Sequence, residues 1–284
     1  MSDAATTGPG LQQKGASKGR VAQRPLRFFI LGATGRSGSR LVASALQQGH
    51  LVSAVVRNEA RVAREWRNLK SIEIIVGDVA DAATIECSWA GQAPDALFCM
   101  LSSEQKPHDA VSTGTRAVID ALAAEREASA DQGRTRPFIS IASWGLGPTE
   151  PFITGWGPRA IVGFAKRTFW AGPYCDFQKQ FELLFAARQK GLLRPTFIAP
   201  PILTDAACET AYLSGDTQAM RQMMRLSSTV ARMCIADLAI KLAERAVGGE
   251  ETPEWVAIRD LPKRGGAQAV PAHLLTEMAG AVQS

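Results

Sequence analysis

The stretch that decides the fold is residues 28–38, which reads Phe28-Phe29-Ile30-Leu31-Gly32-Ala33-Thr34-Gly35-Arg36-Ser37-Gly38. A short apolar run that ends at a glycine is typical of a buried parallel strand. From Ser37 to Gln48, apolar side chains recur on one helical face, and Gly49 ends the pattern. The stretch therefore predicts a strand, a glycine-rich turn and a helix in direct succession.

Elements of the same two kinds alternate along the rest of the chain. Further strands are predicted at residues 51–56, 72–76, 96–100, 138–142 and 196–199, and further helices at 58–69, 109–128 and 174–189. Short elements are predicted near residues 216–225, 236–247, 255–258 and 271–282. Because parallel neighbouring strands need a helical crossover, this order predicts an α/β fold with a doubly wound, Rossmann-like parallel sheet.

The glycines of the turn have a spacing that suits a dinucleotide. Gly32 permits a tight turn, Gly35 lets the backbone approach a pyrophosphate, and Gly38 lets the helix pack closely on the strand. The N-terminus of the helix would bind the anion. The alternative is a glycine-rich turn that binds no nucleotide. The predicted cofactor site comprises Gly32, Thr34, Gly35, Arg36, Ser37, Gly38, Arg57, Asp78, Val79, Met100, Leu101, Gln178 and Pro200.

The choice between NAD and NADP depends on the charge after the second strand. NAD sites place a carboxylate there, whereas this chain has Arg57, and Arg36 lies in the loop itself. Two guanidinium groups can clamp a 2′-phosphate, so NADP(H) is the predicted cofactor, although Glu59 nearby weakens this. After the third strand, Asp78 could bind the adenine amino group, or it could cap the next helix.

The composition excludes several other classes of function. The net charge is +5, but residues 1–27 carry five basic residues and one acidic residue, so the rest of the chain is nearly neutral. This distribution predicts no nucleic-acid partner. No apolar run is long enough to predict a membrane span. The three histidines are scattered, which predicts no metal site. The five cysteines form no close pair and are interpreted as reduced thiols of a cytoplasmic protein.

The same patterns predict how the chain is divided. Residues 1–24 are rich in small and polar side chains and are predicted to be a disordered tail, with a transit peptide as the alternative. Residues 25–284 are predicted to form one NAD(P)-binding domain. Its small substrate lobe would be formed mainly by residues 144–173 and 200–235.

These motifs together resemble the atypical short-chain dehydrogenase/reductase superfamily, in its NAD(P)H-binding, NmrA-like and flavin-reductase-like branch. The likeness rests on the glycine-rich loop, on Val55-Val56-Arg57 and on Gly77-Asp78-Val79, with later segments at 195–205 and 228–239. It covers roughly residues 27–258. The resemblance implies a nicotinamide cofactor, but it leaves the substrate open because the superfamily includes reductases, isomerases, dehydratases and redox sensors.

The resemblance also implies where catalytic residues would lie. Standard members use a serine after the fifth strand and a Tyr-x-x-x-Lys pair on the next helix. Here Ser143 and Tyr174 stand at the first two places, but Gln178 replaces the lysine. Without that positive charge, Tyr174 is a weaker proton donor. The alternatives for Tyr174 are a general acid or an anchor at the start of the helix.

Between these places lies an aromatic segment, residues 144–173, that contains Trp144, Trp156 and Trp170. It is predicted to be a lid over an apolar or aromatic substrate, with a packed core insertion or a homodimer interface as the alternatives. The sequence thus predicts an NADPH-dependent reductase that transfers hydride to a bulky apolar small molecule. The alternatives are a non-redox enzyme that keeps the nucleotide, such as an isomerase or cyclase, and an NmrA-like sensor without turnover.

Overall fold

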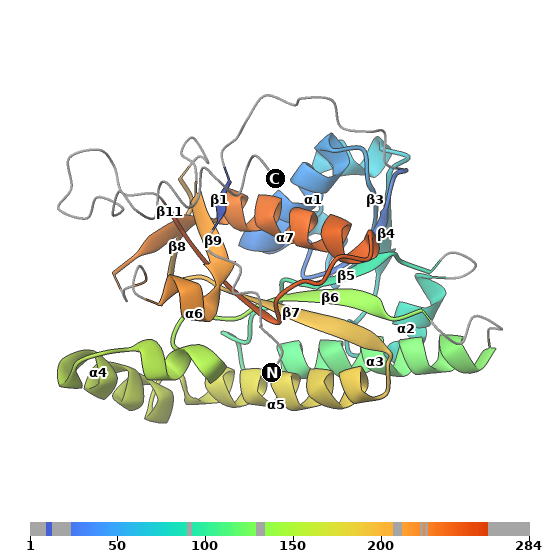
Figure 1. The fold of residues 1–284 in the computed structure, drawn as a ribbon. Coiled ribbons are helices and arrows are strands. Elements are labelled where there is room, and N and C mark those ends of the chain that lie inside the picture. The colour runs from blue at the N-terminus through green and yellow to red at the C-terminus, as the bar shows by residue number, and fades with distance from the viewer. Residues whose placement is uncertain are drawn as a thin grey trace, which may run out of the picture.

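The fold is a parallel sheet between two layers of helices, as seen in a computed structural model that describes residues 10–12, 24–89, 93–128, 134–206, 212–221, 224 and 227–260. Helices α1 (Arg36–Gln47) and α7 (Arg232–Val247) cover one face, and α3 (Ala110–Ala128) and α5 (Ala171–Gln189) cover the other (Figure 1). The predicted α/β, doubly wound architecture is confirmed.

The main sheet has the strand order β1-β9-β11-β7-β6-β5-β2-β3-β4. The parallel strands are β2 (Arg27–Leu31), β3 (Leu51–Val56), β4 (Ile72–Val76), β5 (Ala96–Cys99), β6 (Arg136–Ile141), β7 (Leu193–Ala199) and β11 (Trp255–Asp260). The chain passes from β2 outward to β4 and then returns to β5 on the other side of β2. In such sheets ligands bind at this reversal, outside the carboxyl ends of the strands.

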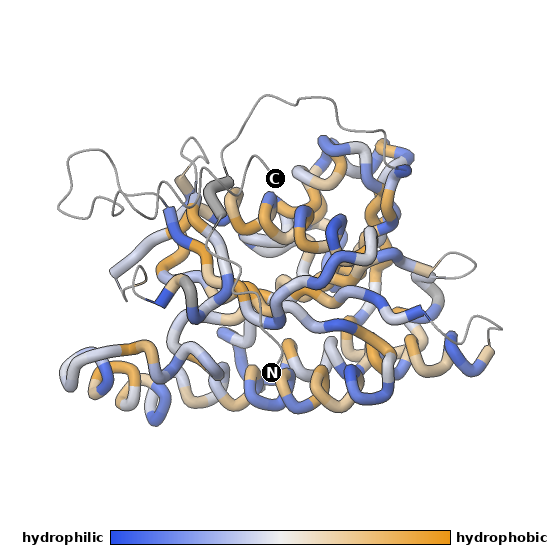
Figure 2. The backbone as a smooth tube through the Cα atoms, in the orientation of Figure 1, coloured by the Kyte–Doolittle hydropathy of each residue, from blue (hydrophilic) through white to orange (hydrophobic). Residues whose placement is uncertain are grey.

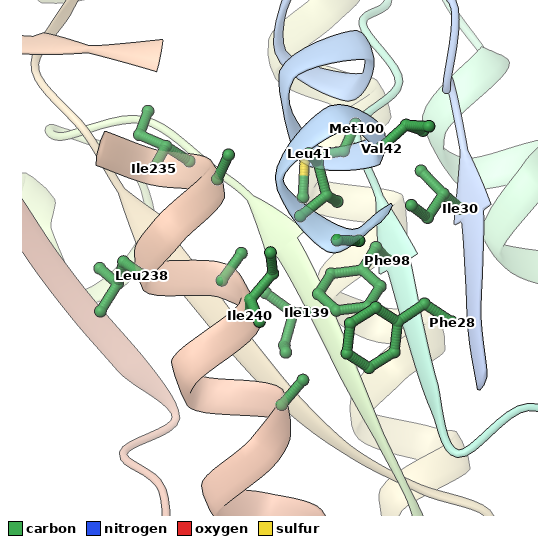
Figure 3. Close-up of a cluster of buried hydrophobic side chains, with 14 of the residues drawn as sticks. Phe28, Ile30, Leu41, Val42, Phe98, Met100, Ile139, Ile235, Leu238 and Ile240 are labelled. Carbon is green, nitrogen blue, oxygen red and sulfur yellow. The ribbon is translucent and has the colours of Figure 1, made fainter. Parts of the chain in front are cut away.

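Strand β2 is buried on both faces, which explains its continuous apolar sequence. Phe28 and Ile30 pack toward α1 and α7, whereas Phe29 and Leu31 belong to the core on the α3 and α5 face. Figure 3 shows the first core, in which the rings of Phe28 and Phe98 meet edge to face at 5.0 Å. The central strands are largely hydrophobic in Figure 2. Burial of both sheet faces is the main stabilising feature of the fold.

The predicted helix at residues 58–69 is wrong. The segment forms two short 3-10 helices, η1 (Glu59–Arg61) and η2 (Arg64–Asn68), separated by extended backbone at Val62 and Ala63. Val62 and Trp66 are both buried in the core beside α1. The extended backbone at Val62 and Ala63 interrupts the helix, although residues four positions apart would also share one face of a continuous helix.

Several short elements were not predicted. They are α2 (Ala82–Cys87), η3 (Gly147–Phe152), α4 (Trp156–Arg167), and a two-stranded parallel sheet of β8 (Ile202–Thr204) and β10 (Thr229–Ala231), whereas the element predicted near 216–225 is present as α6 (Thr217–Met220). β9 (Tyr212–Asp216) joins the main sheet antiparallel to β11, so the region 200–235 is only partly separate from that sheet. The element predicted at 271–282 lies outside the described residues.

The N-terminal segment is more ordered than predicted at two places. Gly10–Gln12 forms β1, which pairs antiparallel with β9, so the expected disorder is wrong for these residues. Arg24 forms a bidentate contact with the buried carboxylate of Asp95, at 2.8 and 3.2 Å. Burial raises the pKa of Asp95, but hydrogen bonds from Arg24, from the Arg27 amide and from Arg134 outweigh it, so this pKa is lowered.

The cysteines differ in state. Cys99 and Cys175 are free, and burial raises the pKa of the Cys99 thiol to about 11. Cys234 in α7 is disulfide-bonded, so the prediction of reduced thiols is wrong at this position. Within the described ranges, no helix is long and apolar enough to cross a bilayer.

Candidate cofactor and substrate groove

The glycine-rich turn brings α1 unusually close to the sheet. Gly32 has a φ of +78°, and a Cβ there would lie 2.8 Å from the carbonyl carbon of Met100. A Cβ on Gly38 would lie 2.0 Å from the Gly32 carbonyl oxygen. Side chains at these two positions would collide with the backbone. Gly32 and Gly38 therefore have the roles in the turn and in helix packing that the sequence predicts.

The turn leaves the N-terminus of α1 free to bind an anion. Gly35 precedes the helix in an extended conformation, no side chain caps it, and no acidic residue lies in the first turn. The Gly35 amide donates back to the Gly32 carbonyl at 2.9 Å, which closes the turn. The unpaired amides of the first helical turn and the positive end of the helix dipole suit the diphosphate of a dinucleotide.

A groove of about 760 Å³ opens at this edge of the sheet, where the strand order reverses. Its volume is typical of small-molecule and cofactor sites. Most of the residues predicted for the cofactor line it: Gly32, Thr34, Gly35, Arg36, Ser37, Arg57, Val79, Met100, Leu101 and Pro200. The fold thus gathers residues from five separate segments into one surface.

One end of the groove is basic. Arg36, Arg57 and Arg61 line it next to Asn58, at the end of β3 and in the glycine-rich turn. Glu59, which weakened the prediction of NADP, is outside the lining and pairs with Arg67 at 3.5 Å. Among the described residues that line the groove, Glu104 is the one carboxylate. This end therefore has the charge that a 2′-phosphate requires.

Asp78 does not cap the next helix, and its contact with the adenine amino group stays a prediction. Its side chain is exposed and lies outside the groove lining, and its carboxylate accepts from the Ala80 amide at 3.0 Å. The cap of α2 is instead Asp81, whose carboxylate accepts from the Ala83 amide. The cause is a short Asx turn, which directs Asp78 back to its own backbone.

Helix α5 does not present Tyr174 to the groove. Its groove-lining residues are Pro173 and Phe177, one position before Tyr174 and Gln178 respectively, and neither predicted residue is in the lining. The Tyr174 ring packs instead beneath the Lys166 ammonium, 4.6 Å from the ring centroid. One residue turns a helix by about 100°. The two positions of α5 that face the groove, where a Tyr-x-x-x-Lys pair would have to lie, are therefore the apolar residues Pro173 and Phe177.

Buried polar contacts hold α5 in this rotation. Asp176, which is 1% exposed, accepts from the amides of Val111 and Ser112 at 2.9 and 3.0 Å and so caps α3. One turn later, Gln180 is bonded to Ser140 and Thr115. Rotating α5 to bring Tyr174 into the groove would leave these groups buried without partners, which is costly.

Ser143 lies in the groove, unlike Tyr174. It follows β6 beside Ile141 and Ala142, and its hydroxyl donates to the Trp144 carbonyl at 3.4 Å. The predicted serine and tyrosine are therefore not brought together on one surface. Among the described lining residues there is no tyrosine, lysine or histidine.

The three tryptophans of the aromatic segment have three different environments. Trp170 lines the groove as predicted. Trp144 is buried in the core, with its ring 5.8 Å from that of Phe152. Trp156 is 88% exposed on α4. The predicted lid is therefore corrected at Trp144 and Trp156, because the core takes up the first ring and α4 points the second into solvent.

Sequence reasoning missed several lining residues. They are Val55, Val56, Asn58, Arg61, Ser102, Ser103, Glu104, Gln105, Ile141, Ala142, Pro173, Phe177, Pro201, Leu203 and Arg232. Those after β3, β5 and β6 could have been found, because the carboxyl ends of all parallel strands share one edge. Arg232 begins α7 and has no such signal in the sequence.

Comparisons with known proteins agree with this geometry. Residues 32–246 match the model of the NAD(P)H-binding family. The chain is 24% identical over 241 residues to averufin oxidase stcO of Emericella nidulans, covering 79% of this chain and 78% of that protein. It is 23% identical over 260 residues to averufin oxidase A of Aspergillus flavus, covering 85% and 90%.

A solved structure supports the fold. The anaerobillin reductase of Escherichia coli O157:H7 superposes with a TM-score of 0.56 at 20% identity, covering 84% of this chain and all of that one. At this identity the likeness concerns the fold alone. The family match spans the glycine-rich turn, the groove and most of α7. The chain therefore belongs to the NAD(P)H-binding family.

Proposed function

We propose that this protein is an NADPH-dependent reductase that transfers hydride from the nicotinamide to a bulky apolar or aromatic small molecule. The observation that carries the proposal is the asymmetry of the groove. Arg36, Arg57 and Arg61 make its β3 end basic, whereas Trp170 and Phe177 make its other side apolar. A phosphorylated adenosine suits the first end, and an apolar acceptor suits the second.

The bound cofactor would supply the hydride, and the chain would supply orientation. The amides at the start of α1 would hold the diphosphate, and the three arginines would hold the 2′-phosphate. Ile141, Pro173 and Phe177 would exclude water from the nicotinamide side, which keeps donor and acceptor in contact. The Ser143 hydroxyl is one of several neutral side-chain donors in the lining, and no tyrosine or lysine lies among the described lining residues, so an acceptor that needs no positioned acid during hydride transfer suits the site best.

The relatives support a redox role on organic molecules. Two of them are named for the oxidation of averufin, and the structural neighbour is named for the reduction of anaerobillin. We extend from them only the class of reaction. The apolar lining of this chain's own groove is what favours a large apolar acceptor.

The proposal is tested first by the choice of cofactor. Calorimetry should show NADPH binding at least tenfold more tightly than NADH, because charge-assisted contacts to the phosphate add affinity. Arg57→Asp should abolish or reverse the preference, since it places a carboxylate against the phosphate. Arg67→Asp is the matched control, because Arg67 pairs with Glu59 outside the groove lining. Equal affinity of the native protein for both cofactors would contradict the proposal.

Turnover is tested separately. NADPH oxidation, followed by absorbance with a panel of quinones and other aromatic acceptors, should be faster for apolar acceptors than for small polar aldehydes. A second candidate function is favoured by the absence of Tyr174 from the groove: a cofactor-bound sensor like the NmrA-type proteins. That function predicts tight NADP(H) binding with no oxidation of NADPH by any acceptor in the panel.

A further inference from the structure

Arg232 is a buried cation in the wall of the groove. It is the first residue of α7 and only 7% exposed, yet it lines the groove together with Pro200, Pro201 and Leu203. Burying a guanidinium group is costly unless its charge is compensated. The positive charge of Arg232 must therefore be compensated by nearby negative groups.

The protein supplies only part of that compensation. The Arg232 guanidinium donates to one carboxylate oxygen of Asp205 at 2.9 Å. The same oxygen also accepts Arg40 at 2.9 Å, so one carboxylate is shared between two cations. Asp205 is itself 51% exposed, which weakens its field at the buried guanidinium. The cluster of Arg40, Asp205 and Arg232 carries one excess positive charge.

The helix adds to this excess. α7 begins at Arg232 with no acidic residue in its first turn, although its N-cap residue Ala231 donates its amide to the carboxylate of Asp260 at 3.3 Å, which offsets part of the helix dipole. The N-terminus of a helix carries a partial positive charge, so a cation there is unfavourable and an anion is favourable. The excess positive charge of Arg40, Asp205 and Arg232 therefore favours an anion on the groove side of Arg232.

The position of Arg232 indicates which molecule brings that anion. β8 and β10 place it beside Pro200, at the carboxyl end of β7, whereas the 2′-phosphate end lies at β3. Strands β7 and β3 are four steps apart in the main sheet, which is about 19 Å at ordinary strand spacing. The amides of α1 already suit the diphosphate. The apolar side chains of Trp170 and Phe177 line the same groove.

We propose that Arg232 binds an acidic group of the substrate, a carboxylate or an ionised phenol carried on a planar apolar ring system. This inference rests on the proposed function for the site and extends it to the substrate's charge. The excess charge of the cluster provides affinity, and the apolar side chains receive the ring. Arg232 is then a specificity-determining residue rather than a participant in hydride transfer.

The test is a binding comparison on the NADP⁺-loaded protein, in which no turnover is needed. Anthraquinone-2-carboxylate and anthraquinone-2-carboxamide have nearly the same shape but differ in charge, and both can be titrated by quenching of tryptophan fluorescence. The native protein should prefer the acid by about tenfold to a hundredfold, the usual worth of a charge-assisted contact. Arg232→Gln should remove this preference, and Arg232→Lys should restore part of it.

Two further variants separate the groove cation from its neighbours. Arg40→Gln removes a guanidinium that shares Asp205 but does not line the groove, so the preference for the acid should persist. Asp205→Asn removes the internal competitor, so the affinity for the acid should rise. Added sulfate should displace the acid and leave the amide bound.

The outcomes distinguish this inference from its alternatives. Equal affinity for acid and amide, or binding of neither, would overturn it. If Arg232→Gln instead weakens NADPH tenfold and leaves the acid preference intact, Arg232 holds the cofactor diphosphate and the inference is wrong. If the charge preference is found but no acceptor oxidises NADPH, the inference stands while the proposed reductase activity fails.

Discussion

The close approach of α1 to the sheet can be tested by adding a single methyl group at Gly38. Its Cβ would lie 2.0 Å from the Gly32 carbonyl oxygen and 3.0 Å from the Ala33 Cα. Because carbon and oxygen atoms that are not bonded pack no closer than about 3 Å, the start of α1 must move by about 1 Å. Gly32 cannot yield, since its own Cβ position is blocked by the Met100 backbone.

The cost follows from this displacement. Overpacking of this kind destabilises a domain by about 3 kcal/mol, which lowers the melting temperature by roughly 6–12 °C for a domain of this size. The same movement would lengthen hydrogen bonds from the first-turn amides to the diphosphate beyond ordinary range, so NADPH affinity should fall at least tenfold.

The assay is thermal unfolding with and without NADPH, together with calorimetric titration of Gly38→Ala. Gly157→Ala in α4 is the matched control, because nothing lies within 4 Å of its Cβ position. There alanine should stabilise the protein by about 0.5–1 kcal/mol. A Gly38→Ala protein with native melting temperature and native NADPH affinity would refute the reasoning about this turn.

Three more outcomes are expected. Tyr174→Phe should change turnover less than about threefold, because this ring is outside the groove, whereas loss of a positioned acid lowers turnover roughly 10²–10⁴-fold. A hundredfold loss of turnover in steady-state kinetics would show that α5 rotates to bring Tyr174 into the groove. Deleting the chain through Arg24 should lower the melting temperature by about 2–6 °C relative to a truncation that keeps Arg24, since the buried carboxylate of Asp95 loses a partner. The pKa of Asp95 is lowered in the folded state, so this difference should be present at neutral pH and disappear as falling pH protonates the carboxylate; a difference that survives in acid would contradict it. Trp156 and Phe164 are 88% and 65% exposed on α4, so association of two copies through this helix should appear in light scattering as a dimer. The double variant Trp156→Ser, Phe164→Ser should then be a monomer, and a native protein that is monomeric at all concentrations would exclude this interface.

Most residues of the predicted cofactor site could be identified from local sequence patterns. Gly32, Gly35 and Gly38 are read from spacing, and Arg57 from its place after a strand, because adjacent residues in the chain largely set a turn and a strand end. The parallel sheet itself then brings these ends together at one edge. This is why most of the predicted cofactor residues line the groove.

The failures have a common cause in contacts between distant segments. The helix predicted at 58–69 is interrupted by extended backbone at Val62 and Ala63, and Val62 and Trp66 pack in the core beside α1. Gly10–Gln12 forms a strand only because β9 offers a free edge about 200 positions later. No local propensity records such a partner.

The sequence by itself determined the order of the main parallel strands, the glycine-rich turn and the basic residues at one end of the groove, because each depends on neighbouring residues in the chain. Only the tertiary structure decided which side of α5 faces the groove, since Asp176 and Gln180 bond to α3 and β6 and so turn Tyr174 away. It also decided that Arg232 meets the groove, because the pairing of β8 with β10 carries the start of α7 there. The rotation of a helix such as α5, and the approach of a distant residue such as Arg232 to the groove, depend on buried contacts between segments far apart in the chain. The periodicity of a single segment does not encode such contacts.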